Sequence, residues 1–222
     1  MDGDSSADAG TGDLPRILPV FPLPGVLLLP DGVLPLNIFE PRYLAMTEDA
    51  LGAGRLIGMI QPAAGEESAP VPDLSRTGCA GRIVQFSETG DGRYLITLAG
   101  LIRFDVGSET EARRGYRRVV ARWTRWQADL ETDDGGDVDR ERLMSAVRGY
   151  FVRRGIEPDW KSLERAGDSR LLAAIGMSCP FAPHEKQALL ETPTLGERAR
   201  LTVALLEMAL HESDAGGSDV RH

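Results

Sequence analysis

The chain has 222 residues, a net charge of −9 and 42% hydrophobic residues, which is the composition of an ordinary globular protein. The acidic balance argues against a dedicated nucleic-acid binder, because such proteins neutralise phosphates with many Lys and Arg side chains. No apolar run approaches the ~20 residues that span a bilayer, and the acidic N-terminus lacks the positive start of a signal peptide. We therefore expect a cytoplasmic protein that does not enter a membrane.

The two cysteines, Cys79 and Cys179, lie far apart in the sequence. Neither belongs to a CxxC or to a Cys/His spacing that would suit zinc. We expect free, partly buried thiols and no metal or other cofactor.

The first part of the chain has the signals of strands and turns. Residues 1–13 are rich in Gly, Ser and Asp and predict a disordered tail. Short apolar runs separated by Pro and Gly predict strands at residues 17–21, 33–38 and 56–60. Between them, Pro41 begins a predicted helix that Gly52 ends.

A loop at residues 62–76 separates these elements from a predicted β-hairpin at residues 82–106. The hairpin turns at residues 89–92, and Gly100 marks a bend or bulge. Residues 113–126 predict another long strand. Together these elements form a predicted domain over residues 14–128.

An abrupt change in composition follows, because residues 129–141 carry seven acids and one Arg. We expect an acidic, solvated linker at residues 129–137 and a helical subdomain at residues 138–212, followed by a disordered tail at residues 213–222. Helical spacing, caps and prolines predict helices at residues 138–154, 169–177, 183–191 and 194–211. Strands followed by helices indicate the α+β class.

Three sequence blocks narrow the choice of fold within the α+β class. They are residues 34–43 (LPLNIFEPRY), residues 81–84 with 91–100 and 103–104 (GRIV, DGRYLITLAG, RF), and residues 180–191 (PFAPHEKQALLE). In this order they resemble the N-terminal substrate-binding domain of Lon proteases, here as a stand-alone form. The resemblance implies a PUA-like antiparallel β-barrel with one inserted helix, followed by a C-terminal helical bundle.

The resemblance also implies a function. It suggests a non-catalytic module that binds unfolded or degron-bearing polypeptide, or a protein partner, as an adaptor or regulator in protein quality control. The candidate binding residues are Phe39, Glu40, Arg42 and Tyr43. A structural role competes with this one: Glu40 and Arg42 would pair locally at the start of the helix, while Phe39 and Tyr43, four residues apart, would share a helical face and fill the core.

The chemistry of the whole protease is not expected in this sequence. A phosphate-binding loop needs a Lys after a Gly-rich turn, but Lys161 follows Trp160 and Lys186 follows Glu185. A Ser–Lys pair would need a buried Lys, and we expect Lys161 at the surface. We therefore assign no catalytic residue and expect no enzyme; an unrecognised hydrolase has no triad, dyad or metal set to support it.

RNA binding is the alternative function. PUA-like barrels elsewhere bind RNA. Residues 113–126 combine six arginines with Tyr116, Trp123 and Trp126, and arginine with aromatic residues suits phosphate contact and base stacking. The candidate patch consists of Arg118, Arg122, Trp123 and Arg125. A solvated strand face neutralised by the acidic run that follows would explain the same pattern.

Overall fold

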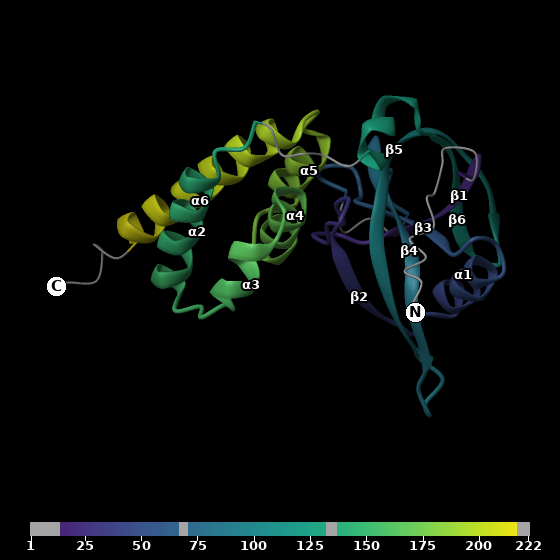
Figure 1. The fold of residues 1–222 in the computed structure, drawn as a ribbon. Helices are drawn as coiled ribbons and strands as arrows, with labels where there is room; N and C mark the ends of the chain where they lie inside the picture. Colours follow the sequence, from purple (N-terminus) through teal and green to yellow (C-terminus); the bar gives the residue numbers. More distant parts are fainter. Residues whose placement is uncertain (1–13, 67–70, 132–136, 217–222) are drawn as a thin grey trace, which may run out of the picture.

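The computed structural model describes residues 14–66, 71–131 and 137–216, with side chains described as far as His211. The strands, one α-helix and one 3-10 helix form a strand lobe (residues 14–131), and the remaining helices form a helical lobe (residues 137–216) beside it (Figure 1). The α+β class predicted from the order of the elements is therefore confirmed. The predicted tail at residues 1–13 and residues 217–222 of the predicted tail at 213–222 lie outside the described residues.

Six strands make up one sheet: β1 (Ile17–Pro22), β2 (Val33–Ile38), β3 (Leu56–Ile60), β4 (Thr77–Glu88), β5 (Tyr94–Arg113) and β6 (Tyr116–Arg122). Their order is β2-β5-β4-β3-β1-β6, and β6 also pairs with β5. Five strands thus pair in a closed ring, to which β2 is added along β5. The ring brings β6, late in the sequence, beside β1, the first strand.

The sheet is mixed, so the prediction that it is entirely antiparallel is wrong. β1 and β3 pair in parallel, while the other pairings are antiparallel. Parallel neighbours need a crossover connection, and the chain between them supplies one through β2 and the helix α1 (Pro41–Leu51). In Figure 1, α1 lies on the side of the strand lobe opposite to the helical lobe.

The predicted strand at residues 113–126 is wrong at both ends. Arg114 and Gly115 adopt positive φ angles of 49° and 87°, and they form the turn between β5 and β6. After β6 the chain forms a 3-10 helix, η2 (Thr124–Leu130). Periodicity alone did not reveal the turn, because Arg114 is an unusual residue for a positive φ.

The predicted bend at Gly100 is confirmed. Pairing between β4 and β5 shifts register here, since Ala80 pairs with Ile102 but Gly81 pairs with Gly100, which leaves Leu101 unpaired. A Cβ atom on Gly100 would lie only 1.9 Å from the carbonyl oxygen of Leu29. Glycine therefore allows another segment of backbone to approach the strand closely.

The helical lobe contains α2 (Arg140–Arg154), α3 (Trp160–Arg165), α4 (Asp168–Ser178), α5 (Pro183–Glu191) and α6 (Leu195–Gly216). The predicted caps are present: the Asp139 carboxylate accepts a hydrogen bond from the Arg142 N–H (3.0 Å), and Gly155 ends α2 with a φ of 64°. The short α3 was not predicted. α6 continues to Gly216, so the prediction of a disordered tail from residue 213 is wrong for its first four residues.

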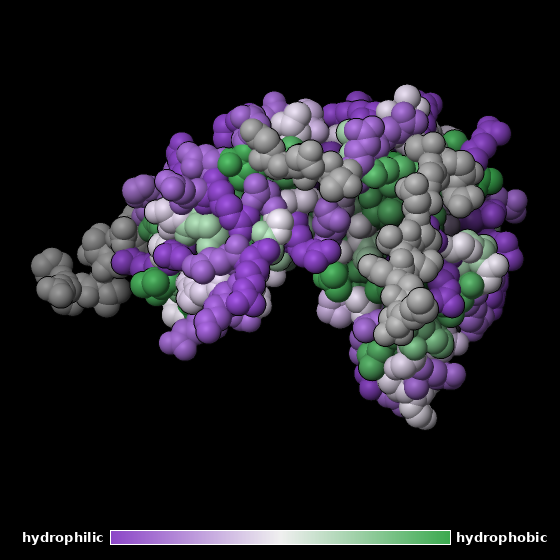
Figure 2. Space-filling model, in the orientation of Figure 1, coloured by the Kyte–Doolittle hydropathy of each residue, from purple (hydrophilic) through white to green (hydrophobic). Residues whose placement is uncertain are grey.

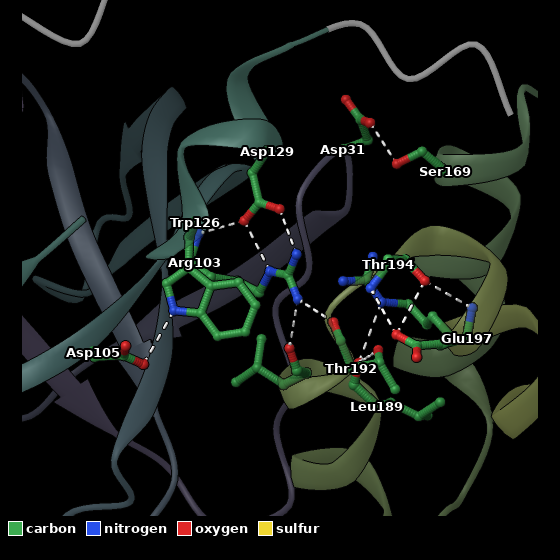
Figure 3. A network of polar contacts seen from close by, with 12 residues as sticks. Asp31, Arg103, Asp105, Trp126, Asp129, Ser169, Leu189, Thr192, Thr194 and Glu197 are labelled. Carbon is green, nitrogen blue, oxygen red and sulfur yellow. Dashed lines mark hydrogen bonds and ion pairs between the residues drawn. The ribbon is translucent and has the colours of Figure 1, made fainter. Parts of the chain in front are cut away.

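A buried ion pair lies where the lobes meet (Figure 3). Arg103 of β5 pairs with Asp129 at 2.5 Å, and the two side chains are 4% and 7% exposed. The same guanidinium donates hydrogen bonds to the carbonyl oxygens of Leu190 (3.1 Å) and Thr192 (2.5 Å) at the end of α5. Asp129 is therefore part of the folded structure, which corrects its assignment to a solvated linker; residues 132–136 of that linker lie outside the described residues.

The lobes also share a hydrophobic core. One cluster of buried residues includes Phe21 and Met46 from the strand lobe together with Leu143 and Leu206 from the helical lobe. Figure 2 shows a largely hydrophilic surface with small apolar patches and a hollow between the two lobes. Within the described ranges, no helix is long and apolar enough to cross a membrane.

Candidate functional site

The candidate site is built at the start of α1. Pro41 occupies the first turn, where its fixed φ and missing N–H are tolerated. Glu40 does not cap the helix with its side chain; instead its carboxylate accepts a hydrogen bond from Arg42 Nε (3.0 Å) and pairs with the same guanidinium at 2.8 Å. The predicted local pair between Glu40 and Arg42 is therefore confirmed.

The two aromatic residues of the motif differ in their surroundings. Tyr43 is buried, with its ring centroid 4.1 Å from that of Phe21, and the Arg42 guanidinium lies 4.6 Å from the Tyr43 ring. Phe39, by contrast, is 63% exposed. The prediction that both rings fill the core is thus wrong for Phe39, because it follows the inward-facing Ile38 at the end of β2 and alternation directs it outward.

Tyr43 and Arg42 line a cavity of about 350 Å³ that we call the signature pocket. Its wall combines rigid apolar groups with a few polar ones. The lining residues are Pro22, Pro24, Arg42, Tyr43, Pro62, Val71, Pro72, Gly115, Tyr116 and Arg117. Apolar walls with a few polar groups are typical of ligand pockets, and this combination suits an aliphatic or aromatic side chain that brings its peptide backbone with it.

Polar contacts hold the walls of the signature pocket in place. Arg117 donates a hydrogen bond to the carbonyl oxygen of Pro72 (2.7 Å) and forms an ion pair with Glu109. Gly115 has a φ of +87°, and a Cβ atom on it would lie 3.3 Å from Arg42 Cβ. The turn between β5 and β6 thus needs glycine both for its backbone angle and for its contact with α1.

Behind the pocket, the Tyr116 hydroxyl donates a hydrogen bond to Asp49 of α1 (2.7 Å). Burial, together with this bond, raises the pKa of Tyr116 to about 12. The same hydrogen bond is the main reason that the pKa of Asp49 is lowered, with further help from Arg114 and Arg113. These contacts attach the turn between β5 and β6 to α1.

The Tyr43 hydroxyl differs from that of Tyr116, because no described residue forms a hydrogen bond with it. Burial raises the pKa of Tyr43, so the hydroxyl keeps its proton near neutral pH. Tyr43 is also one of the residues that line the signature pocket. It can therefore donate a hydrogen bond to a ligand in the signature pocket.

A second cavity, of about 490 Å³, lies at the other end of β6, and we call it the arginine cavity. It brings together three of the four residues proposed for a nucleic-acid patch: Arg122, Trp123 and Arg125. Arg118 does not line this cavity, and its guanidinium donates hydrogen bonds to the carbonyl oxygen of Glu111 (3.1 and 2.8 Å).

The two cysteine thiols and the Lys186 side chain are buried within the fold. Cys79 and Cys179 are free and buried, and burial raises the pKa of both thiols, to about 11 for Cys179. Lys186 is largely buried and donates a hydrogen bond to the carbonyl oxygen of Gly25 (2.9 Å). The described ranges contain no cluster of His, Cys, Asp or Glu able to hold a metal ion.

Several walls of the signature pocket were not predicted from the sequence. Residues 62–76 were predicted only as a loop, yet Pro62, Val71 and Pro72 line it, and so do Gly115 and Tyr116 from the turn that was taken for a strand. These segments meet only through the closed ring of strands. No local motif in the sequence would have joined them.

Comparison with known proteins places this geometry in a family. Residues 17–208 match the ATP-dependent protease La (LON) substrate-binding domain. Lon protease 2 of Myxococcus xanthus is 30% identical over 205 residues, which cover 87% of this chain and 24% of that protein. Lon protease 2 of Sorangium cellulosum is 32% identical over 212 residues, covering 92% and 26%. The chain thus spans about a quarter of the length of these relatives.

Solved structures agree on the fold. The Lon N-terminal domain protein from Xanthomonas campestris superposes with a TM-score of 0.60 at 24% identity, covering 85% of this chain and 97% of that one. The N-terminal domain of Mycobacterium avium complex Lon protease gives a TM-score of 0.59 at 16% identity, covering 86% and 98%. Since the family match takes in both lobes and the signature pocket, the chain belongs to the Lon substrate-binding domain family.

Proposed function

We propose that this chain is a non-catalytic module that binds unfolded polypeptide and that the signature pocket is its binding site. The observation that carries the proposal is the position of Arg42 and Tyr43. These two residues of the family's sequence signature line a largely apolar cavity together with prolines and a second tyrosine. Folded proteins bury most of their large apolar side chains, so such a pocket favours polypeptides that have lost their fold.

The pocket offers two kinds of contact. The rings of Tyr43 and Tyr116 and the prolines would bury one apolar side chain, which contributes roughly 1.5–3 kcal/mol. The free Tyr43 hydroxyl would donate a hydrogen bond to a backbone carbonyl oxygen of the client. Neither contact selects a particular sequence, so we expect weak binding to many unfolded chains.

The same proposal extends to the cellular role. The named relatives are proteases, and the matched region is their substrate-binding domain. A chain of this kind would select polypeptides for other proteins, either as an adaptor or as a regulator in protein quality control.

We also propose a PUA-like barrel for residues 14–128, an acidic linker that begins after η2 and runs to residue 137, and a C-terminal helical bundle. The closed pairing of five strands supports the first part. The change from η2 to helices, with an acidic stretch between, supports the rest.

The test uses one exposed residue of the pocket and one matched control. Val71 lines the signature pocket and is 76% exposed, while Val152 of α2 in the helical lobe is 77% exposed. Val71→Asp would place a charge at the pocket and should weaken binding of a fluorescent, permanently unfolded polypeptide by about tenfold, or ~1.4 kcal/mol. Val152→Asp adds the same charge elsewhere and should change the affinity by less than about twofold, under 0.5 kcal/mol.

Fluorescence anisotropy would give both affinities, and circular dichroism would verify that both variants are folded. Equal affinities for the two variants would remove the signature pocket from the proposal. If the unmodified protein fails to bind unfolded polypeptide at all, the proposed function itself is wrong.

A further inference from the structure

We propose that the arginine cavity binds a carboxylate group of the polypeptide client. This inference rests on the proposed function and assigns a second subsite, about 20 Å along β6 from the signature pocket, since Arg122 lies six positions after Tyr116 in an extended strand. The cavity, of about 490 Å³, is large enough for a terminal residue or an acidic side chain.

Arg122 supplies the main cationic group. No described residue forms a hydrogen bond or an ion pair with its guanidinium, although the side chain is held close to the sheet. A Cβ atom on Gly107 would lie 3.0 Å from Arg122 Nε and 3.5 Å from its Cγ. Glycine at position 107 therefore leaves room for the arginine to lie across β5 with its donors unused.

Arg125 supplies a second guanidinium in a defined orientation. It lies 4.3 Å from the centre of the Trp126 ring, on which it stacks. Its nearest carboxylate oxygen, Asp105 Oδ1, is 3.8 Å away and already accepts hydrogen bonds from Thr77 (2.9 Å) and Trp126 (3.1 Å). Asp105 thus serves the fold and leaves the donors of Arg125 available.

The rest of the wall completes a site for an anion with an apolar part. Thr124 and Gln127 add a hydroxyl and an amide that no described residue engages. The Trp123 indole N–H is already bonded to the carbonyl oxygen of Pro15 (3.1 Å), so its ring presents apolar surface. Planar guanidinium groups match the geometry of carboxylates and bind them with charge-assisted hydrogen bonds.

Charge favours a carboxylate over the phosphates of a nucleic acid. Two arginines and one aspartate give the cavity a formal charge of +1, which suits a single carboxylate. A polynucleotide would need several phosphate contacts along a path, but the guanidinium of neighbouring Arg118 is bonded to the Glu111 carbonyl oxygen. The net charge of −9 would also repel a long polyanion.

The experiment compares three fluorescent peptides that share one apolar sequence. The first ends in a free carboxylate, the second in an amide, and the third in an amide with one internal Glu. Anisotropy titrations of the full chain at low salt would compare the unmodified protein, Arg122→Gln with Arg125→Gln, and a control. The control, Lys161→Gln with Arg170→Gln, removes the same charge from two exposed residues of the helical lobe.

We expect a peptide with a carboxylate to bind at least about fivefold more tightly than the plain amide. The first peptide reports a chain terminus and the third an acidic side chain, so their order identifies the source of the carboxylate. The advantage should fall below about twofold in the Arg122/Arg125 variant and persist in the control.

Equal binding of all three peptides would overturn the inference but leave the proposed function intact, as would an advantage that the Arg122/Arg125 variant retains. Absence of any peptide binding would overturn both. Binding of a structured RNA that depends on Arg122 and Arg125, without a carboxylate advantage, would assign the cavity to phosphate instead.

Discussion

At the scale of single residues, the ring of Tyr43 contributes to stability, whereas its hydroxyl is proposed to contribute to binding. Its ring is buried against Phe21, whereas its hydroxyl has no hydrogen-bond partner among the described residues. Tyr43→Phe keeps the ring, so the free energy of unfolding should change by less than about 0.5 kcal/mol. The affinity for unfolded polypeptide should fall by about 0.5–1.5 kcal/mol, the usual contribution of a hydrogen bond. Urea unfolding and anisotropy measure the two effects, and an unchanged affinity would contradict a role for the hydroxyl.

Asp49 makes a prediction about pH. Its pKa is lowered in the folded protein, chiefly by the Tyr116 hydroxyl. The ionised carboxylate therefore stabilises the fold fully at any pH above its ordinary pKa of about 3.9. This stabilisation is lost as the pH falls from that value towards the pKa of the folded protein. Asp49→Asn should therefore lower the free energy of unfolding by about 1–3 kcal/mol at neutral pH. The difference from the unmodified protein should shrink below about pH 4. A difference that stays constant with pH in urea titrations would contradict this.

At the scale of elements, local signals predicted most boundaries. β2, β3, α1 and α5 have the predicted limits, because prolines, glycines and alternating apolar residues mark both ends of each. The failures occur where local signals are weak or misleading. Arg114 forms a turn despite being an arginine, and α3 is only six residues long. Its cap, the Asp159 carboxylate, accepts a hydrogen bond from the Ser162 N–H (3.2 Å), a signal that is visible in the sequence but common in loops.

The contact between β5 and the Leu29 segment can be tested at Gly100. A methyl group there would lie 1.9 Å from the Leu29 carbonyl oxygen, whereas one on Gly90, in the turn between β4 and β5, would meet nothing within 4 Å. Gly100→Ala must therefore displace backbone and should destabilise the protein by more than about 3 kcal/mol. Gly90→Ala should change stability by less than about 1 kcal/mol. Thermal unfolding compares the two variants, and similar losses would contradict the close approach of the Leu29 segment.

At the scale of the whole molecule, Arg103 links the lobes. Arg103→Met would leave the Asp129 carboxylate buried without its partner, which costs about 3–5 kcal/mol in other proteins. It would also remove the donor to Leu190 and Thr192. Because one hydrophobic cluster spans both lobes, we expect the unmodified protein and the Arg103→Met variant each to unfold in a single transition. Tryptophan fluorescence and circular dichroism should give the same midpoint for that transition. Arg170→Met, at an exposed position, is the control and should cost less than about 0.5 kcal/mol.

The candidate site could be predicted only in part, because local sequence signals do not reveal contacts between distant parts of the chain. The signature motif identified Arg42 and Tyr43, which line the pocket, and the local pair of Arg42 with Glu40. It could not identify Val71 or Tyr116, because the closed ring of strands brings them to α1 from distant parts of the chain. Likewise, composition placed Asp129 in a solvated run, and only its pairing with Arg103 shows that it is buried.

The most direct test of polypeptide binding at the signature pocket is site-specific photo-crosslinking. p-Benzoylphenylalanine would replace Val71 at the pocket in one variant and Val152 of the helical lobe in another, two positions of nearly equal exposure. With an unfolded variant of a small protein in solution, we predict a crosslinked product from position 71 and little from position 152, and no product with the folded parent of that variant. Equal crosslinking from both positions, or none from position 71, would contradict the proposed site.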